Sequence, residues 1–347
     1  ETVNGREQWK YYGNTDWYHA LYNDTKPMTQ HNISISGGNK SVKYYLSGGY
    51  ESQRGVIKVN PDRFNKYNMR SKIDVQLAKW AKFTNNTSFY SSTYNYNGVG
   101  SVENAFAYGA RHALACFPLT NPDGTWIYST PYTSYKVANG RHAIYGNGNN
   151  VNIHRKADFA NTAELVLTPI KPLSITANFT YRLHQNRNTN RSTNFYYREY
   201  PNADLGVYNS GAGENSLTET VDTWSYKAAN VFATYKDTFA NDHNLTVMAG
   251  FNYETQYRKD LEAYGKNLIS DELSDLNLVV PNSDGVLETA VYGGQSEYAL
   301  AGFFGRVNYD YKGRYLIEIS GRYDGTSRFA KGSRWGLFPS VSAGWRI

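Results

Sequence analysis

Long stretches of the chain alternate between apolar and polar residues. In "LSITANFTYRLH" (173–184), apolar residues hold the odd positions and polar residues hold the even ones. Successive side chains of a strand point to opposite faces, so this pattern predicts a β-strand with one apolar and one polar face. The stretch of twelve residues is longer than a usual strand of about five or six.

The same alternation recurs and predicts about eleven strands, near 28–36, 42–50, 65–77, 83–94, 157–168, 173–186, 223–237, 244–258, 298–311, 315–323 and 337–347. The connections between them are alternately tight and long. Tight links are expected at 37–41, 78–82, 169–172, 237–243 and 311–314, and long ones at 51–64, 95–156, 187–222, 259–297 and 324–336. Connections sorted by length in this way are typical of a barrel that spans an outer membrane, with short periplasmic turns and long extracellular loops.

The charges within the strands decide which face meets lipid. If Arg70 and Lys72 faced lipid near the midplane, they would cost about 4–8 kcal/mol together. The opposite orientation exposes Met69 and Ile73 to lipid and turns the charges into a wet interior. The residues expected to face the lumen are Arg70, Lys72, Asp74, Arg182, Glu254, Arg306 and Glu318. The predicted fold class is therefore all-β, a transmembrane antiparallel β-barrel.

Composition agrees with this fold class and excludes several others. Only half of each strand would face lipid, which explains a mean hydropathy of −0.64. The net charge of +6 is dispersed along the chain, so the electrostatic footprint of a nucleic-acid-binding protein is missing. The single cysteine, Cys116, excludes an internal disulfide. Both ends stop within a pattern, and we expect the sequence to be a piece of a longer protein.

Two segments carry a resemblance to a known family. "HNISISGGNKSVKYYLSGGYESQRGVI" (31–57) resembles the first barrel hairpin of SusC-like TonB-dependent transporters (the SusC/RagA family). "NTDWYHALY" (14–22) resembles the segment that leaves their plug domain. The stretch 298–347, with "RYDGTSRF" and "FPSVSAGW", is similar to the family's mid-barrel signature. The middle of the chain, about 95–297, matches mainly in its strands.

The resemblance implies a 22-stranded barrel, of which this chain holds about 11 strands, with the plug domain outside the chain. Residues 1–27 would be a plug-exit linker segment and 28–347 the first half of the barrel. The implied function is import of glycans or peptides across the cell outer membrane by a multi-pass protein. The implied partners are a SusD-like surface lipoprotein, the TonB–ExbB–ExbD complex acting through the absent plug segment, an oligosaccharide or peptide ligand, and outer-membrane lipid.

Aromatic residues gather in two of the long loops, at 125–136 and 194–201. Flat rings stack on sugars or peptide side chains, and arginine adds charge recognition. The candidate ligand-binding residues are Trp126, Tyr128, Tyr132, Tyr135, Phe195, Tyr196, Tyr197, Arg198 and Tyr200. The alternative is that these rings pack loop against loop or against a lid.

No catalytic or metal-binding pattern emerges, so we expect no enzyme activity, no catalytic residues, no metal and no cofactor. The seven histidines are scattered without helical metal-site spacing. "NPDGTW" (121–126) lacks the alternating carboxylates of a calcium loop and predicts a turn. In "YDGTSRF" (323–329), Asp324 and Gly325 are predicted to be turn residues.

Three alternatives remain open at this stage. A TonB-dependent siderophore or cobalamin receptor has the same barrel. A passive porin or adhesin barrel has no upstream plug. A soluble, tyrosine-rich β-sandwich carbohydrate-binding module, or lectin, belongs to a different class and would stay in the aqueous phase without detergent.

Overall fold

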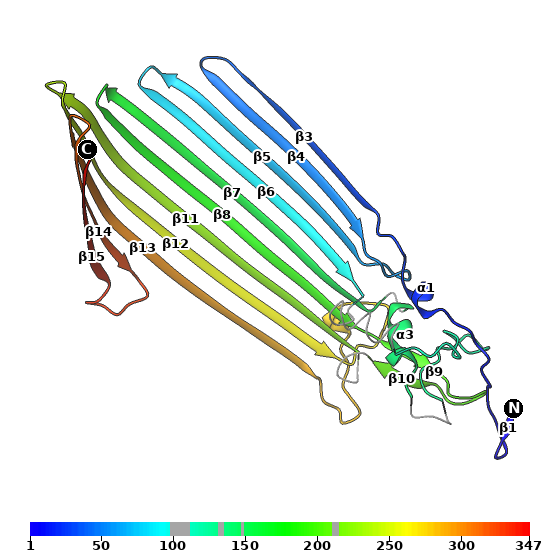
Figure 1. The fold of residues 1–347 in the computed structure, drawn as a ribbon. Coiled ribbons are helices and arrows are strands. Elements are labelled where there is room, and N and C mark those ends of the chain that lie inside the picture. Colours follow the sequence, from blue (N-terminus) through cyan, green and yellow to red (C-terminus); the bar gives the residue numbers. More distant parts are fainter. Residues whose placement is uncertain (98–111, 131–134, 147–148, 210–214) are drawn as a thin grey trace.

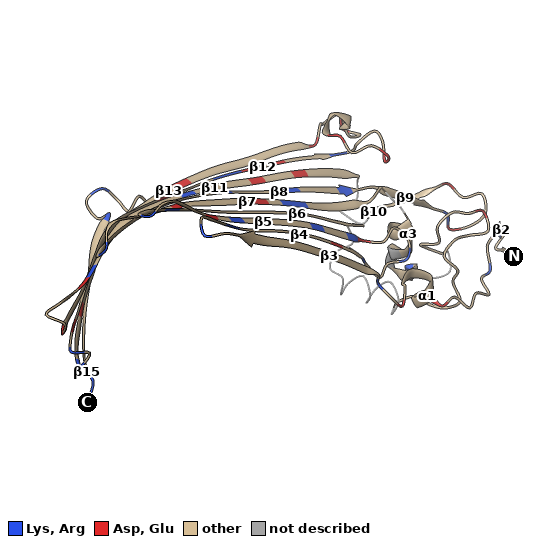
Figure 2. Cartoon of the chain, turned by 90° about the horizontal axis from the view of Figure 1, so that it is seen from above, with Lys and Arg blue, Asp and Glu red and all other residues tan. Residues whose placement is uncertain are grey.

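A computed structural model gives the fold and describes residues 1–97, 112–130, 135–146, 149–209 and 215–347. It is dominated by one antiparallel sheet of eleven strands in the order β15-β14-β13-β12-β11-β8-β7-β6-β5-β4-β3. The strands run side by side along a common slope (Figure 1). Seen from above, the sheet is curved and bends most toward β15 (Figure 2). A curved all-antiparallel sheet confirms the predicted all-β class.

All eleven predicted strands are present, and most are longer than predicted. They are β3 (Met28–Gly38), β4 (Val42–Arg54), β5 (Arg63–Ala78), β6 (Ala81–Tyr96), β7 (Val151–Ile170), β8 (Leu173–Ser192), β11 (Ser216–Phe239), β12 (His243–Lys266), β13 (Thr289–Tyr311), β14 (Tyr315–Thr326) and β15 (Trp335–Trp345).

The largest corrections are at the loop ends of β8, β11, β12 and β13. The connections expected at 187–222 and 259–297 shrink to 193–215 and 267–288, because the strands continue into them. In these extensions both faces carry polar residues, for example Thr220 beside Glu219. An alternation of apolar and polar residues therefore disappears before the strand itself ends.

The connections are sorted by length as predicted. The tight turns lie at one end of the sheet and the long connections at the other (Figure 1). Between β13 and β14, Lys312 and Gly313 both adopt a positive φ, 56° and 65°, which is the backbone of a type I′ hairpin turn. Between β3 and β4, the Asn39 side chain accepts hydrogen bonds from the backbone N–H groups of Ser41 and Val42, at 2.8 and 2.9 Å.

Several short elements lie at the long-connection end. They are β1 (Thr2–Val3), β2 (Arg6–Glu7), α1 (Trp17–Leu21), the 3-10 helix η1 (Val137–Gly140), α3 (Arg141–Gly146), β9 (Asn194–Tyr197), β10 (Gly206–Asn209) and the 3-10 helix η2 (Leu276–Leu278). The β1–β2 and β9–β10 pairs form two small sheets, which sequence alternation did not predict. Among the described residues, no helix is long and apolar enough to cross a membrane.

The sheet has two faces of opposite character. Cross-strand neighbours share a face, and the register aligns Met69, Phe89, Phe159 and Leu183 on what we call the apolar face. It aligns Arg70, Ser88, Ala160 and Arg182 on the polar face. Many large residues of the apolar face are exposed, such as Met69 at 63% and Val341 at 68%. An exposed apolar surface of this extent requires a covering, and lipid supplies one.

The buried core lies beside the sheet rather than within it. A compact group of buried residues, called the loop cluster here, joins the N-terminal segment to the long connections. Its members are Trp17, Leu21, Tyr22, Phe117, Ile127, Tyr128, Val137, Ala138, Ala143, Ile144, Tyr145 and Phe195.

Candidate functional site: the polar face and the loop cluster

The polar face carries all seven residues predicted to face a lumen. Arg70 and Arg182 lie in one transverse row, linked through Ser88 and Ala160. Glu254 pairs with Ala228, and Arg306 pairs with Met248, in the same orientation. Lys72 and Asp74 follow Arg70 at alternate positions, and Glu318 pairs with Asn308. The seven side chains thus share a face, and their contact with a lumen stays a prediction.

Arg182 belongs to an ionic and aromatic group at the loop half of this face. Its guanidinium donates to both carboxylate oxygens of Asp158 at 2.8–3.1 Å. His184 Nδ1 lies 2.9 Å from Asp158 Oδ2. The indole of Trp224 stacks on the imidazole of His184, with centroids 5.1 Å apart, and has the Arg182 guanidinium 5.0 Å from its ring. These contacts hold the indole of Trp224 in a fixed position on the polar face.

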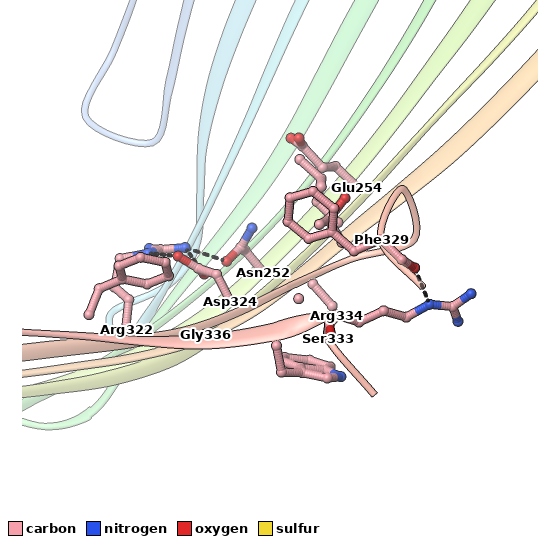
Figure 3. A pocket seen from close by; sticks show the side chains of 14 residues that line it. Asn252, Glu254, Arg322, Asp324, Phe329, Ser333, Arg334 and Gly336 are labelled. Carbon is pink, nitrogen blue, oxygen red and sulfur yellow. Dashed lines mark hydrogen bonds and ion pairs between the residues drawn. The ribbon is translucent and has the colours of Figure 1, made fainter. Parts of the chain in front are cut away.

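A pocket of about 420 Å³ opens where the polar face meets the connection 327–334 (Figure 3). Its lining includes the polar side chains of Asn252, Glu254, Arg322, Asp324, Thr326, Ser333 and Arg334 and the aromatic residues Phe329 and Phe338. Trp335 also borders the pocket, but its ring stacks on Tyr323 and Phe303 of the apolar face. Exposed rings beside charged and amide groups form a set that recognises sugars or peptides.

Hydrogen bonds hold the polar side of this pocket in place. Arg322 donates to Asp324 at 2.8 and 3.0 Å and to Asn252 at 3.0 Å, and these three side chains point toward one another (Figure 3). Glu254 accepts a hydrogen bond of 2.5 Å from the Tyr226 hydroxyl. Of these residues, the sequence singled out only Glu254 as a site residue.

The prediction of a turn at Asp324 and Gly325 is wrong. Both residues lie within β14, and the connection begins after Thr326. Asp324 faces Gly302 across the sheet, and its carboxylate binds Arg322. Asp and Gly are common in turns, so residue type alone misplaced the end of the strand.

The remaining predicted residues of the polar face differ in their partners. Asp74 accepts a hydrogen bond from Thr84 at 2.7 Å and lies 3.6 Å from the Lys82 ammonium. Glu318 lines a shallow hollow with Asn308 and Arg346 near the tight turns. The exposed side chains are Arg70, Lys72 and Arg306, and none of the three forms an ion pair with a described residue.

The candidate ligand-binding aromatics lie mostly inside the loop cluster. Phe195 is 3% exposed and Tyr128 is 9% exposed, and their rings meet edge to face with centroids 5.9 Å apart. Trp126, Tyr135 and Tyr197 pack against the cluster from outside. These contacts correspond to the alternative in which the rings pack loop against loop.

The other candidates in this group lie at the surface. Tyr196 is 45% exposed and donates a hydrogen bond to Asp271 at 3.3 Å. Arg198 donates to Asp123 at 2.9 Å, and Tyr200 has the Arg6 guanidinium over its ring at 4.6 Å. Tyr132 lies outside the described residues. Ligand contact by any of the nine residues stays a prediction.

The segment "NPDGTW" forms a turn, as predicted. Gly124 N–H donates to Asn121 O at 2.9 Å, and Asp123 Oδ1 accepts from the backbone and hydroxyl of Thr125 at 3.1 and 2.7 Å. Burial raises the pKa of Asp123, but the bonds from Thr125 and Arg198 outweigh it and hold that pKa below its ordinary value. In the described part of the chain, no three metal-ligating side chains come together.

Trp17 was not predicted to belong to a core, yet it joins the N-terminal segment to the long connections. Its side chain is 4% exposed, and its Nε1–H donates to Leu114 O at 3.0 Å. The helix that holds it begins at Asp16, whose carboxylate accepts from His19 N–H at 3.1 Å. An aspartate before an apolar pair was the available signal.

His142 is buried at the centre of the loop cluster between two indoles. Its ring centroid lies 5.2 Å from that of Trp17 and 5.6 Å from that of Trp126. Nε2 lies 2.8 Å from Ile127 O, so it carries the proton, while Nδ1 is buried without a hydrogen-bond partner among the described residues. Burial lowers the pKa of His142 to about 4, and the bond to Ile127 offsets only part of that effect. The imidazole is neutral at pH 7.

We therefore expect the loop cluster to lose stability in acid. The pKa of His142 is about 4 in the folded cluster and about 6.5 when unfolded, so the unfolded state binds more protons between these values. Stability is full above about pH 6.5 and falls by about 1.4 kcal/mol per pH unit toward pH 4, about 3 kcal/mol in all. Hydrogen exchange of residues 137–146, normalised for intrinsic rates, measures it. His142→Gln should remove the dependence, and an equal slope in both proteins would contradict it.

Comparison with known proteins shows which of them the chain is similar to. No protein-family model matches the chain. It is 27% identical to the TonB-dependent receptor P26 of Formosa agariphila over 344 residues, which are 97% of this chain and 32% of the receptor. It is 26% identical to the TonB-dependent receptor SusC of Bacteroides thetaiotaomicron, over 96% of this chain and 32% of SusC. The chain is similar to SusC-type TonB-dependent receptors.

Solved structures agree in fold. The RagAB peptide importer in its open-open state matches 98% of this chain and 36% of its own chain, with a TM-score of 0.73 and 22% identity. The outer membrane transporter YddB from Escherichia coli matches 92% of this chain with a TM-score of 0.54. The sheet is thus part of a barrel of the TonB-dependent receptor type. The chain spans about a third of the length of the curated TonB-dependent receptors that it matches.

Proposed function

We propose that the chain is part of an outer-membrane importer that takes up glycans or peptides in a TonB-dependent manner. The observation that carries the proposal is the likeness to TonB-dependent receptors over 97% of the chain. The relatives are TonB-dependent receptors and a peptide importer, which supports transport rather than catalysis. Substrate would pass without any covalent step.

The two faces of the sheet would have different roles in the membrane. The apolar face would meet lipid, and the polar face would line the path that the substrate takes. The pocket at Glu254, Arg322 and Phe329 lies along that path, where β14 ends and its connection to β15 begins. A glycan or peptide entering from outside would pass the loop cluster and the extended strands before it reached this pocket. The extended strands and the loop cluster would form the outer rim.

The partners follow from the same proposal. A SusD-like surface lipoprotein would cover the long connections. The likeness of the chain to SusC and to the RagAB importer supports this partner. The TonB–ExbB–ExbD complex would supply the energy by pulling on a plug that lies outside this chain. In this arrangement residues 1–27 would link plug and barrel, and residues 28–347 would supply part of the wall.

The experiment that tests the function is growth of cells in which the gene for the full-length protein is deleted. Each of a panel of glycans and peptides is supplied as the sole carbon or nitrogen source, with the intact gene returned as a control. Loss of growth on one glycan or peptide class, restored by the gene, supports the proposal. A defect confined to growth on an iron chelate or cobalamin would replace it with the siderophore or cobalamin receptor.

The pocket gives a sharper test at the level of residues. We expect Glu254→Gln to weaken uptake of the identified substrate roughly ten-fold. The substitution removes the charge of the carboxylate, and a hydrogen bond to a charged group contributes about 1.5–3 kcal/mol. Glu318→Gln is the matched control, since Glu318 is an acid on the same face but near the tight turns. Uptake of radiolabelled substrate into cells measures the effect. Equal uptake by the two variants would remove the pocket from the path.

A further inference from the structure

A row of basic side chains borders the apolar face on its loop side. The register turns these residues to the same face as Phe89 and Phe159, and we call them the basic belt: Arg54, Arg63, Arg155, Arg187, Lys227 and Lys259. All six side chains are exposed. They come from six different strands, so the row is made by the register of the sheet and not by a local run of sequence.

The belt stands at the border of the apolar surface. Going along β7 from the tight turns toward the loops, Arg155 comes two same-face positions after Phe159. Arg63 stands in the same relation to Tyr67 on β5, and Lys227 to Val231 on β11. From the belt to the tight turns, the Asp, Glu, Lys and Arg residues on the apolar face of the eleven strands are Glu297, next to the belt on β13, and Asp237, near the end of β11. On β7, the stretch from Leu167 to Arg155 spans about 30 Å of height at the tilt of a barrel strand, close to the thickness of a bilayer core.

The cations of the belt lack the ion pairs that several cations of the polar face have. On the polar face, Lys66 pairs with Glu51, Arg182 with Asp158 and Arg258 with Asp222. None of the six belt residues forms an ion pair with any described residue. The ion pairs near the loop end of the sheet involve residues outside the belt, namely Lys66–Glu51, Arg182–Asp158, Arg258–Asp222, Lys266–Glu288 and Arg322–Asp324. The belt therefore offers unneutralised charge to whatever surrounds it.

Two pairs of arginines in the belt face each other across neighbouring strands. Arg54 is the direct partner of Arg63, and Arg155 is the direct partner of Arg187. Like charges directly opposite each other destabilise a sheet. Among the described residues, the side-chain hydrogen bond of these four arginines is that of Arg155 to the Thr189 hydroxyl, at 3.3 Å. An anion shared between the two guanidinium groups would remove the repulsion.

Acidic residues on this face are fewer than the cations. Glu219 accepts a hydrogen bond from the Thr189 hydroxyl at 3.0 Å, and Glu297 is the cross-strand partner of Tyr257. Glu219, on β11, shares the Thr189 hydroxyl with Arg155, and Glu297 lies on β13, away from both arginine pairs. The belt is therefore net basic, most strongly on β4, β5, β7 and β8.

We propose that the basic belt binds the phosphate groups of anionic lipid in the leaflet that surrounds the loop half of the barrel. Guanidinium groups bind phosphate with two parallel hydrogen bonds, and an arginine pair can hold one phosphate from both sides. Aliphatic stems would lie along the apolar band while the charged ends reach the headgroups. The inference rests on the membrane placement in the proposed function and adds a lipid-binding site on the outside of the barrel.

The test uses the full-length protein in phosphatidylcholine nanodiscs with and without phosphorylated lipid A. Native mass spectrometry counts the lipid A molecules that stay bound. The double variant Arg155→Gln/Arg187→Gln should retain lipid A roughly 25-fold less well, at about five-fold per cation removed. Arg54→Gln/Arg63→Gln tests the other pair in the same way. Arg70→Gln is the matched control, an exposed arginine without an ion pair among described residues, on the polar face.

Each outcome supports or contradicts a different part of the proposal. Loss of lipid A in the double variants, with Arg70→Gln unchanged, supports the site. Equal retention in all variants overturns it while leaving the importer in place. Displacement of lipid A by inorganic phosphate would overturn the assignment to lipid. Failure of the unmodified protein to enter nanodiscs at all would overturn the membrane placement, and with it the proposed function.

Discussion

Val231→Arg is expected to destabilise the barrel by about 2–4 kcal/mol, because it places a charge on the lipid-facing side near the midplane. Val231 is 50% exposed and stands between Ala177 and Phe251 on the apolar face. Without lipid, nothing in the fold forbids an arginine there, since the side chain points away from the sheet. The cost arises from hydrocarbon alone. The measurement is the stability of the full-length protein in lipid vesicles, followed by the heat-dependent shift of its electrophoretic mobility.

The neighbouring residue supplies the control for Val231. Asn230 lies on the polar face, and its amide donates to Asn178 at 2.8 Å. Asn230→Arg loses that hydrogen bond, which contributes about 1 kcal/mol, and otherwise places the charge in water. The two variants differ by one position in the chain and by the face they occupy. Equal losses of stability would remove the argument that the apolar face meets lipid.

Trp17→Ala is expected to destabilise the loop cluster by about 3–5 kcal/mol, the usual cost of removing a buried aromatic side chain. Trp17 fills the contact between α1 and His142, and its indole N–H satisfies the Leu114 carbonyl. Without it, residues 1–27 should detach from the long connections. Hydrogen exchange across 117–130, 137–146 and 194–208 measures the change in the full-length protein.

Tyr18 is the control on the same helix. It is 44% exposed, and its ring packs against those of its neighbours His19 and Tyr22. Tyr18→Ala should therefore change exchange in the long connections by little, within about 0.5 kcal/mol for a surface position. If Trp17→Ala left the exchange of the cluster at the level of Tyr18→Ala, the N-terminal segment would not be part of the core.

The strands were predictable because the two faces of the sheet meet different environments. Where one side contacts hydrocarbon and the other contacts water, each position is held to apolar or polar residues, as in 173–184. Beyond the belt both sides are wet, so β11 and β12 continue past 223 and 258 without alternation. Hydrogen bonds between backbones hold these extensions, and backbone bonds leave no trace in side-chain types.

The candidate site was predictable only in part, for a related reason. Charges on strands, such as Glu254, could be assigned to the polar face by counting positions. The pocket also needs Arg322 and Asp324 from β14 and Phe329 from the next connection, and these meet through the register between strands. The loop aromatics were found by composition, but a ring in a core and a ring on a ligand have the same composition. Tyr128 and Tyr196 differ only in where the chain folds them.

The order of strands also bears on how such a sheet can be made. Each long strand pairs with the long strand before and after it in the chain, and only the small β9–β10 hairpin is skipped between β8 and β11. Adjacent strands joined by turns of a few residues close small loops, which cost little entropy and form quickly. The sheet can therefore grow by one hairpin at a time, each new hairpin using the last edge as its template.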